Sequence, residues 1–332
     1  MATIHDVAKS AGVASKTVSR VINNEGYISS RTREKVNQAI AELGYVPNAL
    51  ARSLRSKRTN TLALIITDIT NPFFTVIARG VEDTANNAGY NVIFCNSDES
   101  QEKEEKYVRL ILQKQVDGIL LVPAGSSSKS IDLITEHGTP VVVIDRKVSA
   151  ETDRVSCDSE GGAYQLTRLL LDLGHRRITL LNGPVDVSTS LDRFMGYQRA
   201  MDEAGLSENI SSFYGSFNQA SGYEGTKQAL SQSPRPTALF AANNVIGIGT
   251  LWALQDLGLN VPDDIAVVAF DDLPTGLVVK PSLTVAAQPA YEMGRRAAEL
   301  MLNRLHAPSL DYLHVTLPVE IITRSSSGKA VQ

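Results

Sequence analysis

After Thr59 the sequence alternates short apolar runs with longer amphipathic stretches, and this alternation restricts the fold more than any other feature. Val, Ile and Leu dominate the runs, which lie at residues 62–66, 92–95, 118–122 and 141–144. The stretches between the first of them, at 73–88 and 103–115, have helical periodicity. Strands that alternate with helices in this way predict βαβ units and a parallel sheet covered by helices.

The alternation then begins a second time. It pauses around Ser156–Gly162, and further strand-like runs follow at residues 178–181, 213–216, 238–241 and 265–270. We therefore expect an α/β fold of two similar lobes in series, each a doubly wound parallel sheet, with a cleft between them.

Composition and motifs argue against several classes of protein. No apolar run in the 332 residues approaches the ~18 that a membrane span needs, and the start lacks the pattern of a secretory signal, so we expect a cytoplasmic protein. Cys95 and Cys157 lie in or beside apolar runs and are expected to be buried free thiols. No P-loop, Gly-x-Ser-x-Gly or His-Glu-x-x-His motif occurs, so no enzyme, cofactor or metal site is expected.

The charge is unevenly distributed along the chain. Residues 1–60 carry ten Lys and Arg side chains against four Asp and Glu, a net charge of +6, whereas the whole chain has a net charge of −4. Phosphate contacts supply most of the non-specific affinity of proteins for nucleic acids. A basic head on an acidic body therefore suggests that only the head meets DNA.

Residues 3–43 have the pattern of three short helices. Thr3 is placed to cap the first helix and Gly12 to end it, and the second helix follows at 15–22. On the face of the second helix opposite its apolar residues lie Ser15, Lys16, Ser19 and Arg20. Small polar and basic side chains at a helix start suit the reading of base edges in the major groove, so an all-α helix-turn-helix head is predicted.

The segment at 45–54 also points to DNA. It has Asn48 as a helix cap, and an apolar Leu54 stands among basic neighbours. A helix this short is not stable alone, so we expect it to order on DNA. Leu54 would then enter the minor groove as a wedge, with Arg52 or Arg55 on the phosphates.

Polar and aromatic side chains follow the predicted strands where those strands end, at the edge where open parallel sheets bind ligands. They are Asp68, Asn71, Phe73, Phe74, Asp145, Arg146, Phe217, Asn243, Asp271 and Gln288, and Arg193 is expected to open a helix after Pro184. Carboxylates, amides and guanidinium groups satisfy sugar hydroxyls, and aromatic faces pack on the C–H face of a sugar ring.

Each of these residues also fits a structural role when it is taken alone. Phe73 and Phe74 fit the core at a helix start, Asp145 with Arg146 fits a loop ion pair, and Asp271 fits a helix cap. Together, at one edge of two sheets, they predict a sugar site in the cleft.

Three stretches resemble the lactose/galactose-repressor family. They are T-I-H-D-V-A-K-S-A-G-V-A-S-K-T-V-S-R-V-I-N, G-Y-V-P-N-A-L-A-R-S-L and T-N-T-L-A-L-I-I-T-D-I-T-N-P-F-F, and the likeness continues to about Arg324. The resemblance implies a transcription regulator, a repressor, with a helix-turn-helix domain at 1–46, a hinge at 47–59 and an effector-binding and dimerisation domain at 60–332. The N-lobe would comprise about 60–160 and 290–320, and the C-lobe about 161–289 and 321–332.

The same resemblance implies roles in the head. Ser15, Lys16 and Arg20 would face bases, Thr17 and Asn23 would hold phosphates, and Leu54 would enter the minor groove, with Thr3, Asn48, Arg52 and Arg55 completing the DNA-contacting set. The family usually has Ser or Thr at the start of the recognition helix, where this chain has Ala14. Either Ser15 caps this helix or the cap is weak.

The resemblance implies a homodimer on a palindromic operator in double-stranded DNA, because one short helix reads too few bases. The dimer surface is expected on the body, around the helix at 73–88. A sugar would close the cleft, rotate the N-lobes of the dimer and change the spacing of the hinges. By linkage, DNA and an inducer weaken each other's binding by the same factor.

The body also resembles periplasmic sugar-binding proteins of the ribose-binding type. The positions that match their ligand set are Asn71, Phe73, Phe74, Asp145, Arg146, Arg193, Phe217, Asn243, Asp271 and Gln288. Ribose, or a pyranose with a similar set of hydroxyls, is the expected effector. A purine is less expected, because Val187 stands where the purine-repressor branch has an arginine. A partner protein as effector, as in the catabolite-control branch, stays an alternative, and the basic head argues against a transport protein.

Overall fold

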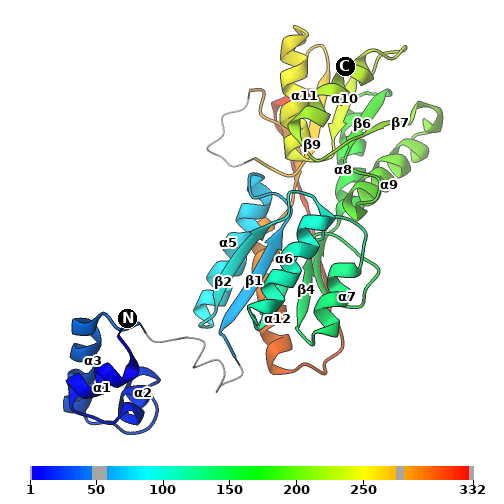
Figure 1. Ribbon diagram of the computed structural model, residues 1–332. Helices are drawn as coiled ribbons and strands as arrows, with labels where there is room; N and C mark the ends of the chain where they lie inside the picture. The colour runs from blue at the N-terminus through cyan, green and yellow to red at the C-terminus, as the bar shows by residue number, and fades with distance from the viewer. Residues whose placement is uncertain (1, 47–57, 274–279, 329–332) are drawn as a thin grey trace. The chain divides into compact units, whose positions relative to one another are not determined.

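The computed structural model describes residues 2–46, 58–273 and 280–328 of the chain (Figure 1). The chain divides into two compact units, Met1–Thr59 and Asn60–Gln332, here called the head and the body. The head is helical and the body has two parallel-sheet lobes, so the predicted fold class is confirmed.

The head packs three helices around a small apolar core. They are α1 (Ile4–Ala11), α2 (Ser15–Ile22) and α3 (Ser30–Leu43), and each contributes a fully buried valine: Val7, Val18 and Val36. As predicted, Thr3 caps α1: its hydroxyl accepts a hydrogen bond from the Asp6 amide at 3.3 Å, and the Asp6 carboxylate accepts one from the Thr3 amide at 2.8 Å. The left-handed Gly12 ends α1, so local chemistry sets the turn into α2.

The start of α2 has no side-chain cap. Its N-cap residue is Ala14, and the Ser15 hydroxyl lies 3.0 Å from Nδ1 of His5. The sequence left open whether Ser15 takes over the cap, and the structure shows that it does not.

We expect Ala14→Ser to stabilise the start of α2 by about 1 kcal/mol, because a hydroxyl there would accept an amide of the first turn. The backbone of Ala14 (φ −71°, ψ 148°) already has an extended N-cap conformation. Hydrogen exchange of the α2 amides in the full chain should slow about five-fold. Ala41→Ser, at an exposed position inside α3, is the control and should slow none. Unchanged exchange in Ala14→Ser would contradict the prediction.

The N-lobe of the body is a six-stranded parallel sheet. Its strands in spatial order are β11 (His314–Leu317), β5 (Asp153–Cys157), β4 (Val141–Ile144), β3 (Gly118–Leu121), β1 (Thr61–Ile66) and β2 (Asn91–Asn96). Because the strands are parallel, β1 and β4 end at the same edge of the sheet.

Helices cover both faces of this sheet. Successive side chains of β1 point to opposite faces and show which helices lie on each. Leu62 and Leu64 pack with α5 (Pro72–Asn87) and α12 (Ala290–His306) on one face. Ile65 packs on the other face with α6 (Gln101–Gln113) and α7 (Lys129–Glu136). A Cβ on Gly80 of α5 would overlap the Tyr291 carbonyl of α12, so these two helices need glycine at their contact. β1 is thus buried from both sides, as its continuous apolar run predicts.

The C-lobe repeats the arrangement with a second six-stranded sheet. Its strands in spatial order are β12 (Glu320–Ile322), β10 (Thr284–Ala287), β9 (Ala266–Phe270), β8 (Ala238–Ala241), β6 (Ile178–Asn182) and β7 (Ser211–Tyr214), and only the β12–β10 pair is antiparallel. Its helices are α8 (Ser159–Asp172), α9 (Ser188–Glu203), α10 (Gln219–Leu230) and α11 (Asn244–Asp256), with short 3₁₀ helices η1 (Ser207–Asn209) and η2 (Ser325–Ser327). Tyr197, Phe240 and Phe270 are fully buried in its core.

The chain passes between the lobes three times, from β5 to α8, from β10 to α12 and from β11 to β12. In Figure 1 the orange helix α12 lies in the N-lobe beside segments coloured blue and cyan. Residues near the C-terminus therefore complete the N-lobe.

Three details of the sequence prediction were wrong. The predicted pause around Ser156–Gly162 overlaps β5, whose sequence D-R-V-S-C is too polar for an apolar-run criterion. β7 begins at Ser211, two residues before the predicted start, because its half-buried residues at the sheet edge give a weak pattern. α9 begins at Ser188, so Arg193 lies in its second turn and does not open the helix.

Candidate functional site

The body contains a cleft between its lobes at the carboxyl ends of their strands. The cleft holds a small cavity. Nine of the ten predicted effector residues line it: Asn71, Phe73, Phe74, Asp145, Arg146, Arg193, Phe217, Asn243 and Asp271. Gln288 does not line the cavity, but its Nε2 donates to Oδ1 of Asp271 at 2.6 Å. Asp68, Glu99 and Thr189 complete the lining among the described residues.

The N-lobe wall is built by the turn from β1 into α5. Asn71 caps α5, with its Oδ1 accepting from the Phe73 amide at 3.0 Å, and Pro72 opens the helix. This turn places Phe73 and Phe74 in the cavity wall with their rings edge to face, 5.1 Å between centroids. Both rings are also part of the N-lobe core, so the structural interpretation is confirmed, and ligand contact by the same rings stays a prediction.

The two lobes present equivalent aspartates. Asp145 follows β4 and Asp271 follows β9, strands at the same place in the spatial order of their sheets. Both residues have left-handed backbones, φ 68° and 66°, and their amides donate to Val155 at 2.8 Å and to Ala286 at 2.9 Å. Asp tolerates this backbone region better than most residues. The same turn thus directs a buried carboxylate into the cleft from each side.

Two buried guanidinium groups accompany these carboxylates. Nη1 of Arg193 donates to the Ala242 carbonyl at 2.7 Å, and its guanidinium lies 4.0 Å from the centre of the Phe270 ring. Arg146 lies 5.5 Å from the centre of the Phe217 ring, which belongs to the other lobe. Burial raises the pKa of Asp145 to about 6, against the opposing effect of both arginines. Burial also raises the pKa of Asp271, against the opposing effect of Arg193.

Several polar atoms at the cleft have no hydrogen-bond partner among the described residues. Oδ1 of Asp145, Nε of Arg146 and Nε of Arg193 are buried and make no hydrogen bond, although Nε of Arg146 lies 3.9 Å from Oδ2 of Asp145 in the predicted ion pair. Buried polar atoms are nearly always paired in folded proteins, and an unmade hydrogen bond costs about 1–3 kcal/mol. The arrangement therefore suits a ligand that both donates and accepts hydrogen bonds.

Other contacts join the lobes at the sides of the cleft. Nδ2 of Asn244 donates to Oδ1 of Asn71 at 3.1 Å. The amide of Lys147 donates to the Ser188 hydroxyl at 2.7 Å, and its ammonium group pairs with Asp192 at 2.6 Å. Of the residues in these contacts, only Asn71 also lines the cavity, and all of the contacts hold the two lobes together.

The sequence prediction missed Glu99 and Thr189 as lining residues. Glu99 follows β2 closely, so applying the strand-end rule to that strand would have found it. Thr189 lies in the first turn of α9, and no pattern in the sequence distinguishes it from its neighbours.

In the head, α2 presents the predicted DNA-reading face. Lys16 and Arg20 are exposed one turn apart, whereas Val18 and Val21 are buried against the other helices. Ser15 and Thr17 are half-buried, and Nδ2 of Asn23 donates to the Ser19 hydroxyl at 3.4 Å. The predicted contacts Asn48, Arg52, Leu54 and Arg55 lie outside the described residues.

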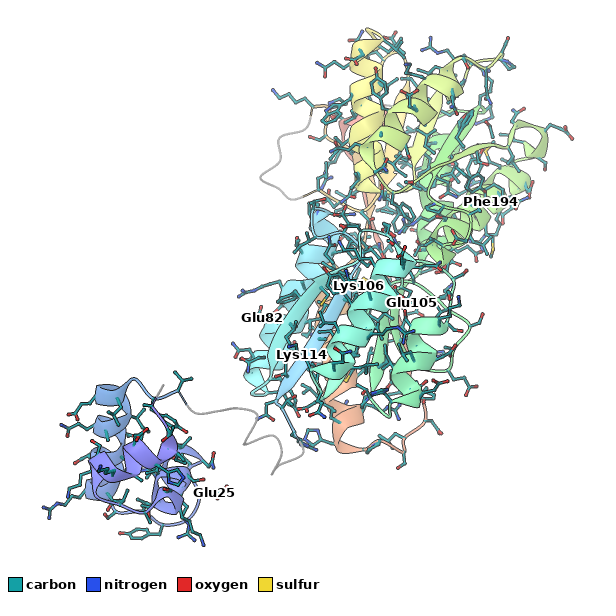
Figure 2. All side chains as sticks on the ribbon, in the orientation of Figure 1. Glu25, Glu82, Glu105, Lys106, Lys114 and Phe194 are labelled. Atoms are coloured by element: carbon teal, nitrogen blue, oxygen red, sulfur yellow. The ribbon has the colours of Figure 1, made fainter. Side chains whose placement is uncertain are left out.

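The described residues contain neither a membrane-spanning helix nor a cluster of metal ligands. No helix there is both long and apolar enough to cross a membrane. In the same residues no group of His, Cys, Asp and Glu side chains is arranged to hold a metal ion. Figure 2 shows polar side chains such as Lys106 and Lys114 over the surface of the N-lobe.

The head matches the family of bacterial regulatory proteins described as lacI family over residues 3–48. The body matches the periplasmic binding proteins and sugar binding domain of LacI family over residues 59–319. The chain is 36% identical to the ribose operon repressor of Halalkalibacterium halodurans over 327 residues, which are 98% of this chain and 97% of that protein.

Solved structures are also similar over most of the chain. The lac repressor dimer bound to operator and the anti-inducer ONPF has a TM-score of 0.86 and 26% identity, with 98% of this chain and 99% of that chain covered. A LacI family transcriptional regulator from Enterococcus faecium with bound ribose has a TM-score of 0.73 and 29% identity, with 82% of this chain and 100% of that chain covered.

Proposed function

This chain belongs to the lacI family of bacterial regulatory proteins and is a DNA-binding transcriptional repressor, and on that premise we propose that a small sugar bound between its lobes controls its affinity for operator DNA. The first candidate is ribose or a pyranose with a similar set of hydroxyls. We also propose that the cleft binds this ligand without catalysis, since the family is regulatory, and that the protein acts in the cytoplasm, where it meets the chromosome.

One observation carries the sugar proposal. Buried polar atoms of Asp145, Arg146 and Arg193 that make no hydrogen bond belong to residues lining a small cavity, whose wall also includes the rings of Phe73 and Phe74. Sugar hydroxyls both donate and accept, so one small ligand satisfies carboxylate and guanidinium together, while the rings pack on its C–H face.

The similar proteins support ribose in particular. One relative over nearly the whole chain is named a ribose operon repressor, and a similar structure contains bound ribose. At 36% and 29% identity these similarities favour ribose without distinguishing it from related monosaccharides.

For the head we propose base contacts by Ser15, Lys16 and Arg20 in the major groove, from a homodimer on a palindromic operator. The similar lac repressor structure is a dimer on its operator. A ligand that favours the closed cleft can change operator affinity only if it binds the two states of the dimer unequally.

Calorimetry with the full chain tests the proposal. The panel is ribose, xylose, glucose, galactose, hypoxanthine and guanine, and the operator is selected from random duplexes by the protein itself. We expect a monosaccharide to bind and the same monosaccharide to change operator affinity about 5–150-fold, the usual range of allosteric coupling. Binding of purines alone would favour the purine alternative. No response to any of these ligands would leave a partner protein as the better candidate effector.

A further inference from the structure

The guanidinium group of Arg146 lies in the cleft, yet its two-nitrogen fork is already occupied. Nη1 and Nη2 donate to the two carboxylate oxygens of Glu99 at 2.6 and 2.7 Å, and Nη1 also donates to the Pro123 carbonyl at 2.9 Å. The side chain of Arg146 is 3% exposed and that of Glu99 is 26% exposed. A ligand therefore meets Nε of Arg146, and not the fork that binds phosphate and carboxylate groups.

The backbone holds Glu99 in this position. Its amide donates to the Thr67 carbonyl at 3.1 Å, directly after β1. Asp98 and Glu99 both have left-handed backbones, with φ of 51° and 56°. Residues other than glycine adopt this conformation rarely, so two in succession indicate a turn that surrounding contacts impose. The carboxylate of Glu99 is thus fixed against Arg146 before any ligand arrives.

Arg193, the other arginine of the cavity, is partly committed to contacts within the protein. One of its terminal nitrogens donates to Ala242, and its guanidinium lies over Phe270. Carboxylates outnumber guanidinium groups among the described residues that line the cavity. The carboxylates are those of Asp68, Glu99, Asp145 and Asp271.

We propose that Glu99 restricts the cleft to uncharged ligands, because its carboxylate occupies the anion-binding fork of Arg146 and adds negative charge beside the cavity. This inference rests on the proposed function and specifies the class of sugar that the cleft binds. A neutral sugar is accepted, and its phosphorylated form is rejected. A phosphate in the cleft would have to displace Glu99 from the fork of Arg146 or lie among these four carboxylates, and like-charge contacts of this kind discriminate strongly between ligands. Glu99 is a specificity-determining residue that acts through Arg146.

The test compares ribose with ribose 5-phosphate, and glucose with glucose 6-phosphate, by calorimetry on the full chain. The wild type should bind the neutral sugar of at least one pair. In that pair, we expect the phosphorylated sugar to bind at least about 100-fold more weakly than the neutral sugar. Glu99→Gln keeps the shape and removes the charge, so the ratio of the two dissociation constants should fall at least about ten-fold. Glu105→Gln is the matched control on α6 (Figure 2) and should leave the ratio unchanged.

Each outcome separates the two proposals. A phosphorylated sugar that binds the wild type as tightly as the neutral sugar overturns the role of Glu99 and leaves the sugar site in place. An unchanged ratio in Glu99→Gln overturns it as well. If no sugar of either kind binds the wild type, the proposed function itself fails. The comparison of neutral and phosphorylated sugars on the wild type needs no variant, so it still tests the proposal if Glu99→Gln does not fold.

Discussion

Arg193→Lys should weaken sugar binding at least about 100-fold and leave operator binding without sugar unchanged. Arg193 is 3% exposed, and its Nη1 is committed to the Ala242 carbonyl at 2.7 Å. Its Nε is buried and unpaired, and the flat guanidinium lies 4.0 Å from the centre of the Phe270 ring. A lysine keeps the charge but cannot stack on the ring and donate in two directions at once. The variant therefore keeps the positive charge of residue 193 and removes the geometry of the guanidinium group, so a loss of binding reports on that geometry.

Calorimetry with ribose and operator binding by fluorescence anisotropy, both on the full chain, measure the two effects. Arg199→Lys is the matched control on the same helix, because that side chain is 47% exposed and pairs with Glu160 at the surface. It should change neither quantity by more than about two-fold. If Arg193→Lys binds operator poorly and ribose normally, the residue belongs to the DNA response and not to the ligand site.

The sequence predicted the architecture of the body because both lobes use the same elements. Runs such as 118–122 and 238–241 are continuous and apolar, since those strands are buried from both faces by helices. Parallel strands end at one edge, so polar residues after β1, β4, β8 and β9 had to meet there. The strand-end rule therefore brought Asn71 and Asp271 together across 200 residues of sequence.

Other parts of the site leave no such pattern. Lys147 and Asp192 form an ion pair between lobes, but each alone looks like any surface charge. The strand-end rule reaches Glu99 after β2, but residue types alone do not show its pairing with Arg146 or the left-handed turn that positions its side chain. The strand β5 has a polar sequence although four of its five residues are buried, because Asp153 pairs with Arg304 of α12 inside the protein, so a search for apolar runs does not find it. Contacts between distant residues decide these features, and local propensity does not.

Asp145→Asn should change the dependence of stability on pH in the absence of ligand. Burial raises the pKa of Asp145 from 3.8 to about 6, so the folded protein holds this proton more tightly than the unfolded chain does. The contribution of this protonated carboxyl group to the free energy of unfolding is fully present below about pH 4 and is lost as the pH rises to about 6. The wild type should therefore lose about 2–3 kcal/mol of unfolding free energy over this window relative to the variant, which has no carboxyl group at this position.

Asn accepts the left-handed backbone of residue 145, so the substitution removes the charge without forcing the turn to change. Urea unfolding of the body between pH 4 and 8, for both proteins, measures the difference. Asp98→Asn is the control at another left-handed position. The Lys103 ammonium lowers the pKa of Asp98, so its contribution has the opposite sign and is lost as the pH falls. Parallel pH profiles for the wild type and Asp145→Asn would mean that Asp145 is ionised in the cleft at no net cost, and that Arg146 and Arg193 compensate fully for its burial.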